Sequence, residues 1–65
     1  MTLQEIKTAI ASGKKVHWAN TGYEVICDKI GQYLIVWTDS GSCIGLTWRD
    51  GVTLNGKPEE FFIGN

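Results

Sequence analysis

The spacing of apolar residues changes at Gly13, and this change constrains the fold more than any other feature of the sequence. Before Gly13, apolar residues recur at intervals of three and four, the period of one helix face; they are Leu3, Ile6, Ala9 and Ile10. After it, apolar residues alternate in short runs separated by turn residues, which is typical of strands. A helix followed by consecutive short strands predicts an α+β domain, with one N-terminal helix packed on an antiparallel sheet of four or five strands.

Both ends of the expected helix carry recognisable signals. Thr2 and Glu5 have the spacing of a capping box, in which each side chain accepts a hydrogen bond from the backbone of the other. Met1 and Ile6 flank this box as an apolar pair that can close over the first turn. Gly13 is suited to the positive φ that often ends a helix. The sequence therefore predicts a helix within the first twelve residues.

The rest of the chain alternates between strand and turn signals. We expect strands or strand-like segments over residues 16–18, 23–28, 33–38, 42–48 and 61–63. Gly, Asn and Asp predict turns over residues 20–22, 29–31 and 39–41. Pro58 is placed to begin one helical turn. No repeat or linker divides the sequence, so residues 1–65 are expected to form a single domain.

The segment over residues 33–38 is apolar on both faces, which predicts a central strand. One short helix covers only one face of such a sheet, and the chain holds three Trp, two Tyr and two Phe. Part of the other face should therefore expose aromatic groups. Exposed apolar patches mark interfaces, so we expect self-association, most simply a two-fold dimer. The alternative is that residues 61–63 fold back as a lid.

Charge and hydropathy exclude several classes of function. The net charge is −1, which provides no long-range attraction for nucleic acid or for an acidic membrane surface. No apolar run approaches the roughly 18 residues that span a bilayer. Residues 1–5 lack the basic and apolar regions of a signal peptide. The sequence predicts a cytoplasmic protein, in the bacterium or in the infected host cell.

The two cysteines, Cys27 and Cys43, are fewer than a small secreted domain usually carries. We expect reduced, buried thiols, with a cross-strand disulfide as the alternative. A structural zinc site needs four nitrogen or sulfur ligands, and these cysteines with His17 supply three at irregular spacing. The sequence therefore predicts no metal and no other cofactor.

Catalytic residues are not expected. His17 is the single histidine, and a nucleophile and an orienting acid would have to lie beside it. The serines fall at a helix end and in a turn, where caps explain them. Glu59 and Glu60 are adjacent and point in different directions. The chain is thus predicted not to be an enzyme.

Two clusters, at residues 17–20 and 47–50, combine an indole with polar groups. Such a surface can stack a base and hold a phosphate, or form a protein-binding hot spot. The candidate binding residues are Trp18, Asn20, Trp37, Trp48 and Arg49. The alternative is that the indoles are core residues and Arg49 pairs with Asp50 or Glu24.

Four stretches, residues 13–16, 17–23, 31–35 and 54–62, resemble short uncharacterised proteins of bacteriophages and prophages. Over about 25 residues, the opening also resembles a phage family that begins with a helix, a Gly-Lys-Lys-Val step and a Trp-bearing strand. Some members of that family sequester nucleotide immune signals or block host defence nucleases. The resemblance implies an accessory phage protein and carries over no binding residue.

The leading hypothesis is a small non-enzymatic phage or prophage protein that binds a host protein, with inhibition of host defence as the role the resemblance implies. The first alternative is a sponge for a small nucleotide, held between subunits by Trp18, Asn20, Trp48 and Arg49. The second is a single-stranded nucleic-acid binder. The nucleic-acid hypothesis is weakened because the six basic residues are scattered along the chain and their charge is balanced by seven acidic residues.

Overall fold

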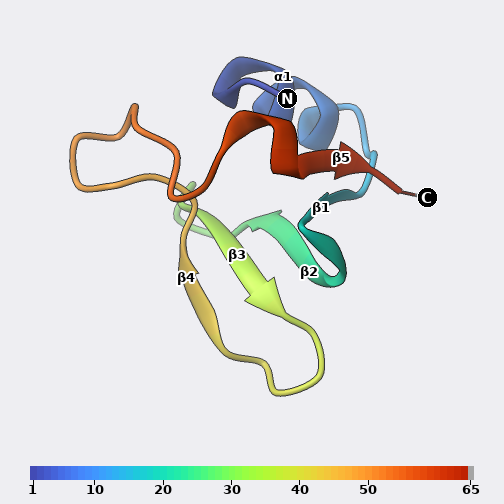
Figure 1. Ribbon diagram of the computed structural model, residues 1–65. Helices are drawn as coiled ribbons and strands as arrows, with labels where there is room; N and C mark the ends of the chain where they lie inside the picture. Colours follow the sequence, from blue (N-terminus) through green and yellow to red (C-terminus); the bar gives the residue numbers. More distant parts are fainter. Residues whose placement is uncertain (65) are drawn as a thin grey trace.

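A computed structural model describes residues 1–64 and shows one α-helix packed on a five-stranded antiparallel sheet (Figure 1). The elements are α1 (Leu3–Ala11), β1 (Val16–Trp18), β2 (Asn20–Cys27), β3 (Tyr33–Trp37), β4 (Cys43–Gly45), the 3₁₀ turn η1 (Pro58–Glu60) and β5 (Phe61–Ile63). The strand order is β4-β3-β2-β1-β5. This architecture confirms the predicted α+β fold with its N-terminal helix.

The ends of α1 form as the sequence predicts. The Glu5 carboxylate accepts a hydrogen bond from the Thr2 backbone N–H at 2.8 Å, and the Thr2 hydroxyl accepts one from the Glu5 N–H at 3.2 Å. The bond from the Thr2 backbone, and then that with its side chain, lower the pKa of Glu5 from its ordinary value. Gly13 follows with a φ of +83°. The capping box is confirmed.

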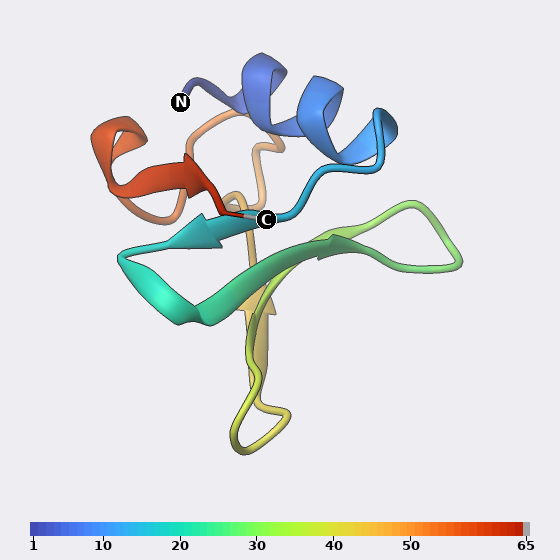
Figure 2. The same ribbon diagram turned by 90° about the vertical axis from the view of Figure 1, so that its right-hand side faces the viewer.

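The core lies between α1 and one face of the sheet (Figure 2). α1 contributes the buried Ile6 and Ala9, two members of the predicted helix face. The other buried apolar residues come from the strands and from the segment after β4; they are Val16, Val25, Ile35, Leu46 and Phe61. Leu3 and Ile10 pack against this cluster from α1, so the predicted apolar face of the helix is confirmed.

The ladder between β2 and β3 determines which residues share a face. Val25 lies opposite Ile35, and Tyr23 lies opposite Trp37, so these side chains share the face that α1 covers. The second face carries the alternate positions Glu24, Ile26, Leu34 and Val36. β3 lies between β2 and β4 and is apolar on both faces, which confirms the expectation for residues 33–38.

Aromatic residues are distributed unevenly between the two faces. Phe62 lies on the second face, opposite His17, and is 36% exposed. The other rings of the strands lie on the face of α1; Phe61 is buried in the core, and Tyr33 lies beneath Lys7 of α1. The expected aromatic exposure on the second face is therefore limited to one ring within residues 1–64, because the strand registers direct the other rings to the first face.

The turn expected over residues 20–22 lies earlier in the structure. β2 already begins at Asn20, and the chain reverses at Ala19, which has a φ of +65°. The Ala19 N–H donates to the Glu60 carbonyl at 2.9 Å, so a contact with η1 fixes the reversal. The Asn20 side-chain oxygen accepts a hydrogen bond from the Gly22 N–H at 2.8 Å within the strand. Asn often makes this local bond in turns, which is why the sequence predicts a turn here.

The strand expected over residues 42–48 is shorter than predicted. β4 covers Cys43–Gly45, and the Leu46 N–H still donates to the Tyr33 carbonyl at 3.0 Å. Tyr33 is the first residue of β3, so the chain beyond Leu46 has no neighbouring strand to pair with. It forms its own small hairpin, closed by a bridge between Thr47 and Leu54. Trp48 therefore lies in a loop and not on a strand face.

The last apolar segment becomes an edge strand. β5 pairs with β1 and contributes Phe61 to the core, so it does not fold over the sheet as a lid. Both thiols are free and exposed, which makes the expectation of buried cysteines wrong. Cys27 is the last residue of β2 and Cys43 opens the edge strand β4, and at such ends no second layer covers a side chain.

Within residues 1–64, no helix combines the length and apolar character needed to cross a membrane. The same part of the chain contains no cluster of three or more His, Cys, Asp or Glu side chains arranged to hold a metal ion.

Candidate functional site

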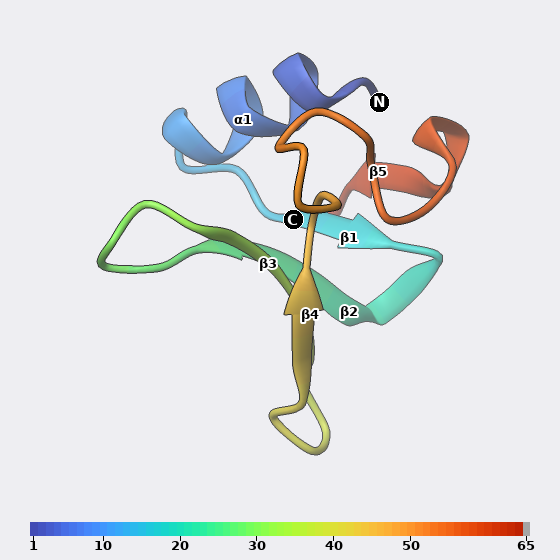
Figure 3. The ribbon, with the colours of Figure 1, turned by 90° about the vertical axis from the view of Figure 1, so that its left-hand side faces the viewer.

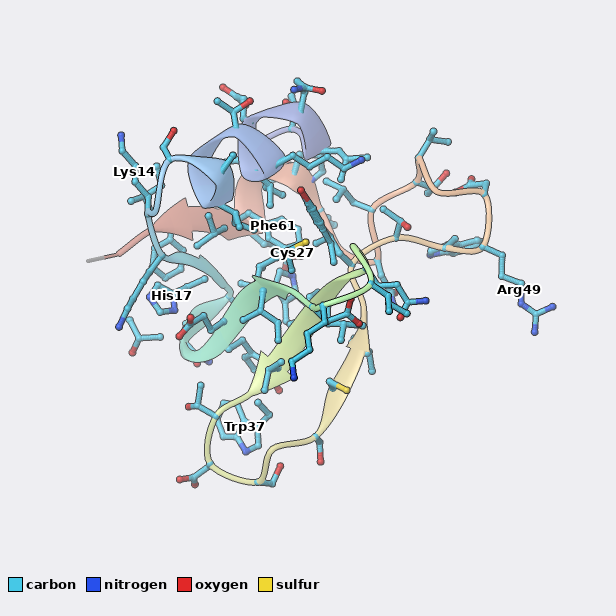
Figure 4. The ribbon with its side chains drawn as sticks, turned by 180° about the vertical axis from the view of Figure 1, so that it is seen from behind. Lys14, His17, Cys27, Trp37, Arg49 and Phe61 are labelled. Atoms are coloured by element: carbon cyan, nitrogen blue, oxygen red, sulfur yellow. The ribbon has the colours of Figure 1, made fainter. Side chains whose placement is uncertain are left out.

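The structure separates the candidate binding residues into two regions. Trp18 and Trp37 belong to adjacent parts of the sheet, and Asn20 opens the strand between them. Trp48 and Arg49 lie in the loop after β4. Figure 4 shows Trp37 beside the β3–β4 turn and Arg49 at the far end of that loop, pointing away from the body of the protein.

The first region is a line of rings that crosses the sheet, with one ring from each of four strands. We call it the aromatic row; it consists of Trp37, Tyr23, Trp18 and Phe61, in the order of β3, β2, β1 and β5. Successive ring centroids lie 4.5, 4.9 and 6.5 Å apart. These separations are within the range of favourable aromatic pairs, so the rings support one another.

Both indoles of the aromatic row lie directly on glycines. A Cβ atom at Gly22 would be 2.3 Å from Cζ3 of Trp37, and one at Gly56 would be 2.6 Å from Nε1 of Trp18. The Trp18 indole N–H also donates to the Glu60 carboxylate at 3.3 Å. Absence of a side chain at these two glycines is therefore what allows the indoles to lie flat against the backbone.

A hollow of about 410 Å³ lies beside the aromatic row, toward the β3–β4 turn. Its lining includes three rings of the row, apolar residues of β3 and β4, and two serines; the main members are Trp18, Tyr23, Trp37, Ile44, Ser40 and Ser42. None of the lining residues carries a formal charge. Tyr23 was not among the sequence candidates, although its alternation with Val25 and its position opposite a strand of aromatic residues could have indicated it.

The second region is the Trp48 loop, residues 47–54, which Figure 3 shows from the side of β4. The Trp48 N–H donates to the Thr53 carbonyl at 2.9 Å, and the Gly51 N–H donates to the Trp48 carbonyl at 3.0 Å. The Trp48 side chain is 64% exposed and that of Val52 is 70% exposed. The loop thus exposes two large apolar side chains to solvent, while its backbone is hydrogen-bonded.

Asp50 stabilises the turn of the Trp48 loop. Its carboxylate accepts hydrogen bonds from the Thr53 hydroxyl at 2.6 Å and from the Thr53 and Val52 N–H groups at 2.9 Å. These bonds, with that of the Thr53 hydroxyl first, lower the pKa of Asp50 below its ordinary value. Arg49 is exposed and forms no ion pair with Asp50 or Glu24 within residues 1–64, so its charge is free for another molecule.

A cleft of about 440 Å³ connects Trp48 to α1 and to the start of β3. Leu3, Lys7 and Tyr33 line it together with Trp48. The Lys7 ammonium lies 5.4 Å from the centroid of the Tyr33 ring, a cation–π distance. The exposed surface around Trp48 therefore includes positive charge from Lys7 on one side and from Arg49 on the other.

His17 has a structural environment. It is 6% exposed, and its two ring nitrogens lie 2.8 Å from the Tyr23 carbonyl oxygen and 2.9 Å from that of Gly64. The Phe62 ring covers it at a centroid distance of 5.6 Å. The imidazole thus connects β1 to β2 and to the chain after β5, and both of its nitrogens are occupied by backbone groups.

Comparison of the chain with protein families, with curated proteins and with solved structures gives no match. The functional argument therefore depends on the geometry of the aromatic row and the Trp48 loop.

Proposed function

We propose that this chain is a small, non-enzymatic binding module that docks on another protein through the Trp48 loop. The observation that carries the proposal is the 64% exposure of Trp48 on a loop whose turn is bonded to the Asp50 carboxylate. Trp and Arg are the residues most enriched in binding hot spots. A loop that is already ordered loses little conformational entropy when it binds. Trp48 and Arg49 therefore combine suitable chemistry with a pre-organised backbone.

The charges around Trp48 define the partner surface. Arg49 and Lys7 are positive; Asp50 keeps its negative charge, but its carboxylate accepts hydrogen bonds from the hydroxyl and backbone of its own loop. A complementary partner would present an apolar pocket for Trp48 with acidic side chains at its rim. Such charge complementarity accelerates association and excludes incorrect partners.

We also propose that the protein is a phage or prophage accessory protein that acts in the bacterial cytoplasm on a host protein, including a component of host defence. The support for this origin is the resemblance in residues 13–16, 17–23, 31–35 and 54–62. Trp48 and Arg49 lie outside all four stretches, so the resemblance does not include the proposed docking residues.

The test compares two double variants that remove similar groups from two exposed turns. Trp48→Ala/Arg49→Ala removes the proposed hot spot, and Lys29→Ala/Ile30→Ala removes a cation and an apolar side chain that is 78% exposed in the β2–β3 turn. A partner retained by the wild-type chain from bacterial lysate is purified, and its Kd is measured by calorimetry. We expect the first variant to weaken binding by about 30-fold or more, and the second to have little effect.

Equal binding of the two double variants would contradict the docking role of the Trp48 loop. Thermal melts of both variants confirm that they remain folded, because exposed substitutions usually change stability by no more than about 0.5 kcal/mol.

A second copy of the chain is the other partner that a specific observation favours. The second face of the sheet presents Ile26, Leu34, Val36 and Phe62 around a single charged residue, Glu24, and residues 1–64 place no helix on it (Figure 2). Two such largely apolar patches can pack against each other about a two-fold axis. Sedimentation at micromolar concentration tests this dimer, and a single species of 7.2 kDa would rule it out.

The nucleotide sponge has less support. Its site would lie between subunits, because the hollow beside Trp18 in one copy contains neither Trp48 nor Arg49. Within one copy of the chain, the two pairs of candidate residues belong to separate regions.

A further inference from the structure

The hollow beside the aromatic row offers hydrogen-bond donors on an apolar surface. The Tyr23 hydroxyl and the Trp37 indole N–H form no hydrogen bond within residues 1–64. In this part of the chain, every buried side-chain nitrogen or oxygen has a partner. Both donors must therefore reach solvent. Ser40 and Ser42, whose hydroxyls lie 3.0 Å apart, add further polar groups at the edge of the hollow.

We propose that this hollow binds an extended, proline-rich segment of another protein in the polyproline II conformation. Such segments dock on aromatic surfaces, and their backbone carbonyls have no internal partners, so Trp, Tyr and Ser donors can bond them. The three rings also lie close enough together for one short segment to contact all of them. The steps of 4.5 and 4.9 Å from Trp37 through Tyr23 to Trp18 extend over no more than about one polyproline turn, roughly 9 Å.

The composition of the chain identifies the source of this segment. The sequence contains one proline, Pro58, which lies in η1. A second copy of the chain therefore has no proline-rich segment to offer, and the ligand must come from a different protein. This binding site goes beyond the docking role of the Trp48 loop, since the hollow contains no residue of that loop.

Charge distinguishes a proline-rich peptide from a single-stranded nucleic acid. Aromatic rows also stack bases, but that mode needs basic residues along the phosphate backbone. The lining of the hollow contains no Lys or Arg, and the acidic residue Asp39 immediately precedes Ser40 in the adjacent turn. An uncharged peptide is therefore the better fit.

The experiment titrates the full chain with decaproline, with a Gly-Ser peptide of equal length and with an oligothymidylate of equal length. Binding is followed by tryptophan fluorescence and by the indole N–H signals in nuclear magnetic resonance spectra. We expect saturable binding of decaproline at up to millimolar peptide, with the Trp37 indole signal shifted most. The other two probes should not bind.

Matched substitutions locate the site. Trp37→Phe retains a ring and removes the N–H donor, so decaproline should bind about fivefold more weakly. Tyr23→Phe removes only a hydroxyl and should also weaken decaproline binding about fivefold. This second variant tests the proposal if Trp37→Phe is unstable. Trp48→Phe is the control and should bind as the wild type. Absence of decaproline binding, binding of oligothymidylate alone, or an equal loss in Trp48→Phe would overturn the proposal.

Discussion

The aromatic row and the Trp48 loop contain the same kind of residue in opposite situations. In the aromatic row, Trp18 and Trp37 lie on glycines and contact Tyr23 between them. In the Trp48 loop, the indole is 64% exposed, and the turn beside it is bonded to the Asp50 carboxylate. The difference shows that an indole on a paired strand is held by neighbouring rings and contributes to stability, whereas the indole of Trp48, which lies beyond β4, is held by no such contact.

This comparison also separates two ways of presenting a surface. The rings of the row are held by contacts from four strands, so their exposed edges form a rigid surface. The loop is held by a local network of three bonds to one carboxylate. Truncation of a ring in the row should therefore lower stability, whereas truncation of the exposed Trp48 side chain should leave stability nearly unchanged.

The largest expected difference is between Tyr23→Ala and Trp48→Ala. Tyr23 contacts two indoles and packs against the core, so its truncation should lower the free energy of unfolding by about 2–3 kcal/mol. Truncation of the exposed Trp48 should change it by less than about 0.5 kcal/mol. Urea titration monitored by circular dichroism measures both. Similar losses of unfolding free energy in the two variants would mean that the Trp48 side chain contributes as much to stability as the aromatic row does.

A smaller effect tests the glycine beneath Trp37. In Gly22→Ala the new methyl group would lie 2.3 Å from the indole, so the ring must shift, at a cost of about 1–3 kcal/mol. The double variant with Trp37→Ala removes the conflict, and the two substitutions should be coupled by at least about 0.5 kcal/mol. Urea titration of the wild type, the two single variants and the double variant gives the free energies for this double-mutant cycle. Additive losses would show that Gly22 is not needed to accommodate the indole.

The smallest effect concerns pH and the Trp48 loop. The pKa of Asp50 is lower in the folded chain than in the unfolded one, because the Thr53 hydroxyl and the Thr53 and Val52 N–H groups bond its ionised form. The stabilisation of the loop is therefore complete above the unfolded pKa of about 3.9, and is lost as pH falls through the folded value. The amide signals of Val52 and Thr53 should shift in that acidic range.

Asp50→Asn is the control for this titration, since the amide does not ionise. Its Val52 and Thr53 amide signals should not show the same acidic transition. Persistence of the transition in Asp50→Asn would assign it to another carboxyl group. Trp37 and Tyr23 of the aromatic row donate to no carboxylate within residues 1–64, so their signals should stay unchanged over the same range.

The local elements of this fold could be read from the sequence because their signals act over a few residues. The capping box of Thr2 and Glu5 formed, and the two-sided apolar pattern of residues 33–38 became the internal strand β3. Gly13 and Gly41 took the positive φ that their turns require. Each of these features depends on neighbours in the chain, which the sequence presents directly.

The positions of the candidate residues depended on partners distant in sequence. Trp48 became a loop residue because β3 begins at Tyr33 and leaves the chain beyond Leu46 without a neighbouring strand. Tyr23 joined Trp18 and Trp37 because the register of β2 places it opposite β3 and beside β1. The sequence by itself determined the fold class and the helix end, while strand order and register decided which rings are packed and which are free. Register is a property of pairs of strands, and no single segment encodes it.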